Sequence, residues 1–230
     1  MKDTATQRQN RWTPSKRRAT ETLAKRAYDA LEEMILTLDL EPGAVVTEKE
    51  LTRRTGYGRT PLREATLQLG REKLVEVLPR KGILVSDINI AQYLSLLEVR
   101  RVLDRFIAEK AARRATAEQR EDLKRIAAAM EQEAAKKHLV EFMRLDRAFD
   151  AIVETAAQNG FAVNAVKPMH AHCRRFWYLH RHNGDLARAA VLHSRLMHAI
   201  AAGKEKGAGK ASDTLMDYLE RFTRQTLQLM

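Results

Sequence analysis

The chain of 230 residues contains one cysteine, Cys173, so it has no internal disulfide framework. That excludes the small, disulfide-stapled extracellular folds and fits a reducing compartment. Long apolar runs are missing too. No stretch approaches the ~18 apolar residues of a transmembrane helix, and no apolar segment of the signal-peptide kind follows the start. We therefore expect a cytoplasmic protein with no membrane partner.

Strand patterns and proline are scarce in the second part of the sequence. From residue 89 onward, Pro168 is the one proline, and the apolar residues recur at helical rather than strand spacing. The spacing predicts helices at 90–113, 117–137, 139–158, 161–181, 185–202 and 211–228, with a break across the glycine-containing segment 203–209. Residues 89–230 are thus expected to form an all-α helical bundle.

Positive charge is abundant and unevenly distributed. The chain has 41 Lys and Arg against 30 Asp and Glu, a formal charge of +11. Residues 1–20 alone hold six Lys or Arg and one Asp, with no apolar periodicity. This composition predicts a disordered basic arm, which either follows a DNA backbone or is simply solvated.

The most informative stretch is residues 47–69, TEKELTRRTGYGRTPLREATLQL. It reads as two short helices joined by a glycine-containing turn. Thr47 and Glu50 have the spacing of a capping box at the first helix. Thr60 is expected to cap the second helix, with Pro61 at its first position.

The second of these helices has two distinct faces. Leu62, Ala65 and Leu69 recur at helical spacing and are expected to face inward, whereas Arg59 and Arg63 project from the other side. A helix-turn-helix protein places the side chains that meet base edges and phosphates at this end of its second helix. The pattern therefore favours DNA binding over an ordinary helix pair.

The flanking segments complete a winged helix over residues 21–88. A leading helix at 27–37 supplies apolar residues to a small core, and two β-rich runs surround the basic tip Pro79-Arg80-Lys81-Gly82. Between residues 47 and 82, nine Lys or Arg stand against five Glu. A local excess of positive charge of this kind is typical of a surface that binds nucleic acid.

The run from LEEMILTLDLEPG to PRKGILV resembles the DNA-binding domain of GntR-type bacterial regulators, most specifically in its RTPLRE core. By that resemblance, the contacts to bases and phosphates are made by Lys49, Arg59, Thr60, Arg63, Arg80 and Lys81. The family's wing often carries glycine where this chain has Arg80.

The second part is similar to the ligand-binding bundle of FadR-type GntR regulators, through LLEVRRVLDRFIAEKAARRAT and AVLHSRLMHAIAAG. The resemblance implies a small organic acid as effector, commonly beside a divalent metal such as zinc, manganese or magnesium. The usual metal ligands are Asp-x-x-x-His, a later His and a His on the last helix. Asp146 and His193 match this pattern. The chain departs from it twice, because Asp150 stands in place of the first His and Tyr218 in place of the last.

The helical angles give an independent view of these residues. At ~100° per residue, Asp146 lies inside the apolar stripe of Phe142 and Phe149, and Asp150 lies at its edge. A carboxylate pair in an apolar face needs a metal or a buried partner. Arg100 and Arg174 are the candidate partners, and together with Tyr218 they are the predicted ligand-binding residues.

The helical positions of the histidines show which of them could bind a metal. His193 falls in the apolar stripe of its helix and is the candidate metal ligand. His170 and His172, like His180 and His182, are two residues apart, so they project about 200° apart and cannot grip one ion together. Of Arg174, Arg175 and Arg181, we expect only one to enter a pocket as a carboxylate clamp.

Together these features predict a transcriptional regulator that is not an enzyme and binds a palindromic double-stranded operator as a homodimer. The resemblance favours a repressor controlled by a small-molecule effector. Two rivals remain. One is a metal-dependent helical hydrolase with a DNA-binding appendage, using Asp146, Asp150 and His193. The other is an architectural DNA-binding protein without an effector.

Overall fold

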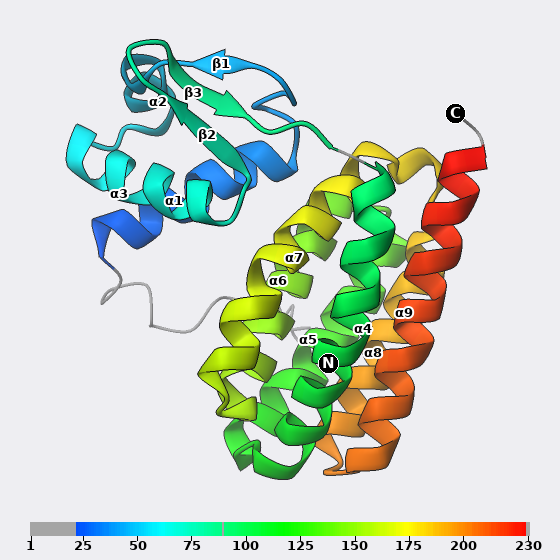
Figure 1. Cartoon of the computed structure of the whole chain (residues 1–230). Helices are drawn as coiled ribbons and strands as arrows, with labels where there is room; N and C mark the ends of the chain where they lie inside the picture. The colour runs from blue at the N-terminus through cyan, green and yellow to red at the C-terminus, as the bar shows by residue number, and fades with distance from the viewer. Residues whose placement is uncertain (1–21, 89, 229–230) are drawn as a thin grey trace, which may run out of the picture.

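The computed structural model describes residues 22–88 and 90–228, so the predicted basic arm lies outside the described residues. Figure 1 shows a small N-terminal unit beside one end of a long helical bundle. The mostly α-helical fold with a small β-wing is confirmed. Strand β3 ends at Val85 and helix α4 begins at Ile90, and the division of the chain into domains at residue 88 stays a prediction.

The N-terminal unit is built from three helices and a small antiparallel sheet. Its elements are α1 (Leu23–Leu36), β1 (Val45–Val46), α2 (Glu48–Thr55), α3 (Arg59–Arg71), β2 (Val75–Leu78) and β3 (Gly82–Val85). The strands lie in the order β1-β3-β2, with Val45 opposite Leu84 and Leu78 opposite Gly82. At Gly82 a Cβ atom would lie 2.6 Å from the Val46 carbonyl oxygen, so only glycine fits between these strands.

Helix α1 begins earlier than the sequence predicts. The Thr22 side chain accepts a hydrogen bond from the Lys25 N–H and caps the helix, which adds a turn before residue 27. At the other end Leu38 has φ of +60° and lies outside the helix. The buried residues Leu31 and Ile35 pack on α3 and close the core of this unit.

The turn between α2 and α3 follows the expected plan except at one position. Thr47 caps α2 by accepting from the Glu50 N–H at 3.1 Å, and Gly56 ends that helix with φ of +75°. The expected cap at Thr60 is wrong, because Gly58 precedes α3 and Thr60 is its second residue. Pro61, expected at the first position, is the third residue of α3, where it is tolerated because the first N–H groups of a helix have no intrahelical partner.

The bundle consists of α4 (Ile90–Arg114), α5 (Ala117–Ala135), α6 (Leu139–Ala157), α7 (Gly160–Leu179), α8 (Leu186–Ala201) and α9 (Glu205–Gln228). Helices α4 and α9 pack side by side, as Figure 1 shows. The expected start of the last helix at residue 211 is wrong, because α9 includes both Gly207 and Gly209. A Cβ at Gly209 would lie 2.3 Å from Glu109 Oε1, so this glycine lets the two helices approach closely.

Among the helices of residues 22–88 and 90–228, none combines the length and the apolar character that a membrane span requires.

Candidate functional site

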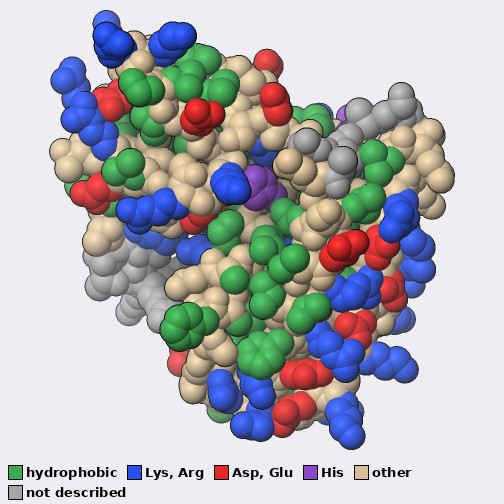
Figure 2. Space-filling view, in the orientation of Figure 1, with side chains coloured by type: hydrophobic (Ala, Val, Ile, Leu, Met, Phe, Trp, Pro, Cys, Tyr) green, Lys and Arg blue, Asp and Glu red, His purple; other side chains and the backbone are tan. Residues whose placement is uncertain are grey.

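The basic residues expected to meet DNA all lie at the surface of the N-terminal unit. Arg59, Thr60 and Arg63 are exposed on the first turns of α3, and Lys49 is exposed on α2. Arg80 and Lys81 form the exposed tip between β2 and β3. Lys and Arg side chains gather at the outer edge of this unit, away from the bundle (Figure 2). The arrangement puts a helix start and a basic loop on one accessible side.

Arg63 already has a partner within the protein. Its Nε lies 2.8 Å from Glu48 Oε1 and its Nη2 lies 3.1 Å from Glu48 Oε2. This pairing raises the pKa of Arg63 and lowers that of Glu48. Because both side chains are exposed, water weakens the attraction. Arg63 can therefore exchange Glu48 for a base or phosphate at low cost.

The tip of the wing is a tight turn with an unusual backbone. The Lys81 N–H donates to the Leu78 carbonyl at 3.1 Å, which places Pro79 and Arg80 at the two central positions. Arg80 has φ of +63°, as the third residue of a type II turn requires. Glycine is preferred there, which explains why the resembling family often has glycine where this chain has Arg80.

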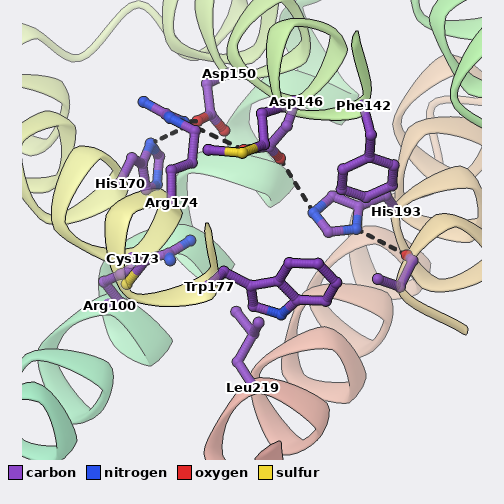
Figure 3. A pocket seen from close by; sticks show the side chains of 12 residues that line it. Arg100, Phe142, Asp146, Asp150, His170, Cys173, Arg174, Trp177, His193 and Leu219 are labelled. Carbon is purple, nitrogen blue, oxygen red and sulfur yellow. Dashed lines mark hydrogen bonds and ion pairs between the residues drawn. The ribbon is translucent and has the colours of Figure 1, made fainter. Parts of the chain in front are cut away.

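A cavity of about 50 Å³ lies in the bundle, between side chains of α4, α6, α7, α8 and α9. Figure 3 shows its two kinds of wall. Phe142, Trp177 and Leu219 form an apolar side, and ionisable side chains form the other. These are Arg100, Asp146, Asp150, His170, Arg174 and His193. Five of the predicted site residues, together with His170, therefore lie around one cavity.

Arg174 holds the two carboxylates of α6 together. Its Nη1 donates to Asp150 Oδ2 at 2.6 Å and lies 3.2 Å from Asp146 Oδ2 (Figure 3). Burial opposes the ionisation of Asp150, but His170 and Arg174 outweigh it and lower the pKa to about 2. Burial and Asp150 likewise oppose the ionisation of Asp146, whose pKa is nevertheless lowered by His193 and Arg174. Both carboxylates are therefore charged at neutral pH.

His170 is a cavity residue that the sequence reasoning missed. Its Nδ1 lies 3.0 Å from Asp150 Oδ2, and its Nε2 lies 2.8 Å from Asp104 Oδ1. Burial lowers the pKa of His170, but the two carboxylates raise it by more than burial lowers it. The pKa of His170 is therefore well above the usual value. A signal was present in the sequence, because His170 stands one helical turn before Arg174 and so shares its face.

Arg100 and His193 each have a fixed partner. The Arg100 guanidinium pairs with Asp104, one turn away on α4, at 2.8 Å. His193 Nδ1 donates to the Ala189 carbonyl at 2.8 Å, and its Nε2 lies 3.1 Å from Asp146 Oδ1. Despite its burial, the pKa of His193 is raised, mainly by its hydrogen bond to Asp146. Both nitrogens of His193 are thus occupied within the protein.

Tyr218, predicted as a ligand-binding residue, does not line the cavity. Its hydroxyl donates to the backbone carbonyl of Asp185 at 3.0 Å, outside the cavity. Leu219, the next residue on α9, faces the cavity instead. One residue along a helix turns the side chain by ~100°, so a small error of alignment moves it to a different face.

The predicted metal ligands do not converge on a free position. Among the described residues, no group of three His, Cys, Asp or Glu side chains is arranged to hold a metal ion. The reason is visible around Asp146 and Asp150, where the Arg174 guanidinium approaches the oxygens that a metal would bind. Of the three arginines considered as a clamp, only Arg174 lines the cavity. Arg175 is fully buried elsewhere, and Arg181 is exposed.

The same helices that line the cavity contact the N-terminal unit. On α6, Arg147 follows Asp146 and pairs with Asp29 and with Glu32 of α1, the latter at 2.8 Å. On α7, His172 Nε2 donates to the backbone carbonyl of Glu72, at the end of α3, at 2.9 Å. Burial lowers the pKa of His172, so the ring is neutral at pH 7 and can keep this role.

A charge link also crosses this junction. Glu32 on α1 is buried, and burial raises its pKa, while Arg174 is the strongest opposing influence. The positive charge of Arg174 at the cavity therefore lowers the pKa of a carboxyl group, Glu32, in the N-terminal unit.

A winged helix with a basic outer face, joined to a helical bundle with a charged internal cavity, defines a DNA-binding regulator with a separate ligand-binding part. The family described as bacterial regulatory proteins, gntR family, matches residues 23–85. The FCD domain family matches residues 95–218, more than half of the chain. The protein belongs to the gntR family of transcriptional regulators, with an FCD domain as its second part.

Individual proteins agree with this assignment. An uncharacterised HTH-type regulator of Streptomyces ambofaciens is 45% identical over 65 residues, which is 28% of each chain. The HTH-type transcriptional repressor RspR of Escherichia coli K12 is 26% identical over 160 residues, 70% of each chain. The solved structure of E. coli McbR/YncC has the same fold, with a TM-score of 0.77 and 18% identity, covering 90% of this chain and 100% of that one.

Proposed function

We propose that this regulator is a repressor, acting in the cytoplasm rather than as an enzyme, whose operator affinity is controlled by a small organic acid in the bundle cavity. The observation that carries the proposal is the placement of cavity and junction contacts on the same two helices. Asp146 faces the cavity and Arg147 faces α1, while Arg174 faces the cavity and His172 reaches the end of α3. The relative RspR of Escherichia coli is a transcriptional repressor, which supports the sign of regulation.

Operator contacts are assigned to the exposed basic side of the winged helix. The start of α3 would enter the major groove, where Arg59 and Arg63 reach base edges and Thr60 and Lys49 reach phosphates. The wing tip, with Arg80 and Lys81, would lie along the adjacent backbone or minor groove. Arg63 would leave Glu48 for this purpose.

A second copy of the chain is the proposed partner of an apolar face on α4. Val99 and Val102 are 46% and 68% exposed, and the partly buried Phe106 shares their face. Hydrophobic side chains run along the front of the bundle, where α4 lies (Figures 1 and 2). Because α4 follows the wing directly, pairing it across a two-fold axis would fix the spacing of the two recognition helices on a palindrome.

The effector would act by changing the balance between two arrangements of the junction. An acid that binds the guanidinium of Arg174 adds an anion beside α7 and changes the charge felt by Glu32. His172 and Arg147 would then hold the winged helix differently. Such control needs only a different affinity of the acid for the two arrangements.

Operator binding tests this proposal through the recognition helix. With an operator selected from random DNA, we expect Arg59→Ala and Arg63→Ala each to weaken specific binding about 5- to 150-fold, the range of one bidentate base contact. Both side chains are exposed, so the thermal midpoint should hardly change. Arg71→Ala, at the other end of α3, is the matched control.

Wild-type affinity in the Arg59→Ala, Arg63→Ala double variant, at the same salt concentration, would contradict the proposed contact face. Footprinting with and without a panel of small carboxylic acids separates the rival functions. Release of the operator by an acid supports a repressor, whereas an unchanged footprint with every acid supports an architectural protein. Turnover of a hydrolysable substrate would support the hydrolase.

A further inference from the structure

Arg174 contacts both Asp146 and Asp150, two of the three residues predicted from the sequence as metal ligands. We infer that its guanidinium is the permanent counter-ion of this cavity, so that the cavity takes a small carboxylate without any divalent metal. The inference deepens the proposed function, since it concerns the same cavity, but its test involves no DNA.

The first argument is the placement of charge. Asp146 and Asp150 stand one turn apart on α6, with side chains 16% and 15% exposed. Two buried carboxylates at this distance repel each other and need a shared cation. Arg174 Nη1 contacts both, at 3.2 and 2.6 Å, and so bridges them as a metal would. A divalent ion would have to expel the guanidinium first.

The second argument concerns the lone pairs that a metal needs. A histidine binds a metal through an unprotonated nitrogen. His193 Nδ1 donates to the Ala189 carbonyl, and its Nε2 faces the negatively charged Asp146. His170 has a carboxylate at each nitrogen, Asp104 on one side and Asp150 on the other. Each of these four nitrogens already lies 2.8–3.1 Å from an oxygen of the protein, so none of them faces an open position.

The third argument is that permanent cations already lie beside the buried carboxylates. Arg100 pairs with Asp104, and Arg174 contacts both Asp146 and Asp150. A divalent ion would add two positive charges to a buried and partly apolar site. The two carboxylates predicted to bind a metal already share the guanidinium of Arg174.

The ligand class follows from the cations that line the cavity. Arg174 and Arg100 both line it, and a guanidinium binds a carboxylate through strong, charge-assisted hydrogen bonds. Phe142, Trp177 and Leu219 provide an apolar wall opposite. A volume of about 50 Å³ has room for roughly three to five waters, so it fits a short acid rather than a large one.

Metal content and thermal unfolding of the full-length protein test the inference. Wild-type protein should contain far less than one equivalent of metal, and EDTA, Mn²⁺, Zn²⁺ or Mg²⁺ should leave its midpoint unchanged. In Arg174→Ala the carboxylate pair loses its cation. Mn²⁺ or Zn²⁺ should then raise the midpoint, by about 5–10 °C at a hundredfold excess over Kd.

Three variants control this result. Arg174→Lys keeps the positive charge and should not respond to metal, and neither should Arg181→Ala, which changes an exposed arginine near the end of α7. The Asp146→Ala, Arg174→Ala double variant should lose the metal response. If Arg174→Ala does not fold, Arg174→Gln, neutral but of similar size, takes its place.

The acid is tested with propionate and benzoate. We expect at least one of them to raise the midpoint of wild-type protein in the presence of EDTA, and not that of the Arg174 variants. A stoichiometric metal in wild-type protein, a loss of stability with EDTA, or an acid effect that requires added metal would overturn the inference. A folded Arg174→Ala protein whose thermal midpoint does not change with any of the metals would also overturn the inference. If only the repressor proposal is wrong, the DNA-binding experiments will contradict it, whereas these thermal results will still be as expected.

Discussion

Arg80 is a single residue at which backbone and charge make opposite demands. Its φ of +63° disfavours any side chain, and a left-handed conformation costs roughly 1–2 kcal/mol for a residue other than glycine. We expect Arg80→Gly to stabilise the protein by about 0.5–1 kcal/mol, after allowing for the greater freedom of glycine in the unfolded chain. The same change should weaken DNA binding and lower the salt slope by about 1.

Lys81→Gly is the control, because it removes the neighbouring charge without a positive φ to relieve. It should weaken DNA binding similarly and should not stabilise the fold. Chemical unfolding and DNA titration at several salt concentrations measure both effects. Equal destabilisation of the two variants would show that strain at Arg80 is negligible.

His170 gives the protein a dependence on pH that can be isolated. The pKa of His170 is raised well above 6.5 in the folded state by Asp150 and Asp104 against the effect of burial. Protonation therefore favours folding, and this stabilisation is complete below pH 6.5 and is lost as the pH rises through the folded-state pKa. We expect the stability difference between wild type and His170→Gln to shrink steadily from pH 6.5 upward.

His172→Gln is the matched control, since burial lowers the pKa of His172 instead. Neutrality of His172 favours folding, so its contribution is present above pH 6.5 and is lost as the pH falls through the folded-state value. Urea unfolding between pH 5.5 and 8.5 distinguishes the two slopes. A constant difference between wild type and His170→Gln would mean that His170 does not titrate as its partners require.

At the cavity, a residue could be predicted from the sequence only where helical periodicity shows which face of its helix it lies on. The helical stripe identified Asp146 and His193 correctly as inward-facing, but it left Arg100 and Arg174 open as partners of the carboxylates. Contacts between helices decide that choice, and no spacing within one helix reveals them. His170 was missed because it was compared only with His172. Tyr218 was predicted, but the next residue, Leu219, faces the cavity, since one residue along a helix turns the side chain by ~100°.

At the level of elements, the glycines of α9 show why the start of the last helix was predicted wrongly. Glycine usually ends a helix, but in α9 Gly209 packs against the Glu109 side chain of α4, where a Cβ would lie 2.3 Å from Oε1. Such packing depends on a helix about a hundred residues earlier in the chain, so local signals cannot report it. The other five bundle helices have boundaries set by local caps and breaks, such as Thr116 before α5, and these were predicted within one or two residues.

The two glycines of α9 should respond differently to substitution. Gly207 is exposed, and the one side-chain atom near an added Cβ is Lys204 Cβ at 3.2 Å. Gly207→Ala should therefore gain most of the helix propensity difference, up to about 1 kcal/mol. Gly209→Ala must displace Glu109 and disturb its pairing with Arg105, so it should gain less or be destabilising.

Thermal and chemical unfolding of both alanine variants, with wild type as reference, measure this contrast. If Gly209→Ala is stabilised as much as Gly207→Ala, the Glu109 side chain does not hold its position against Gly209.

For the whole molecule, the important quantity is charge. The formal excess of +11 includes the basic outer edge of the winged helix and the six cations of residues 1–20. We expect specific and non-specific DNA binding to weaken steeply with salt, because each phosphate contact releases a counter-ion. Deleting residues 1–18 should flatten the slope if the arm meets phosphate.

Binding isotherms of the full chain and the deletion variant, from low to moderate salt, give the two slopes. Equal slopes would mean that the arm is only solvated. Arg125→Ala, which removes an exposed cation of the bundle, should leave the slope unchanged and controls for net charge.

The bridging guanidinium has one more consequence for how the protein behaves in a cell. A cation carried by the chain itself is present once in every folded molecule, so its occupancy cannot follow the supply of trace metals or be stripped by a chelating metabolite. It is also covalently attached to α7, whereas a bound ion can exchange. On the same helix, His172 is bonded to the C-terminal end of α3. A ligand that binds Arg174 therefore acts on a helix that contacts the winged helix directly.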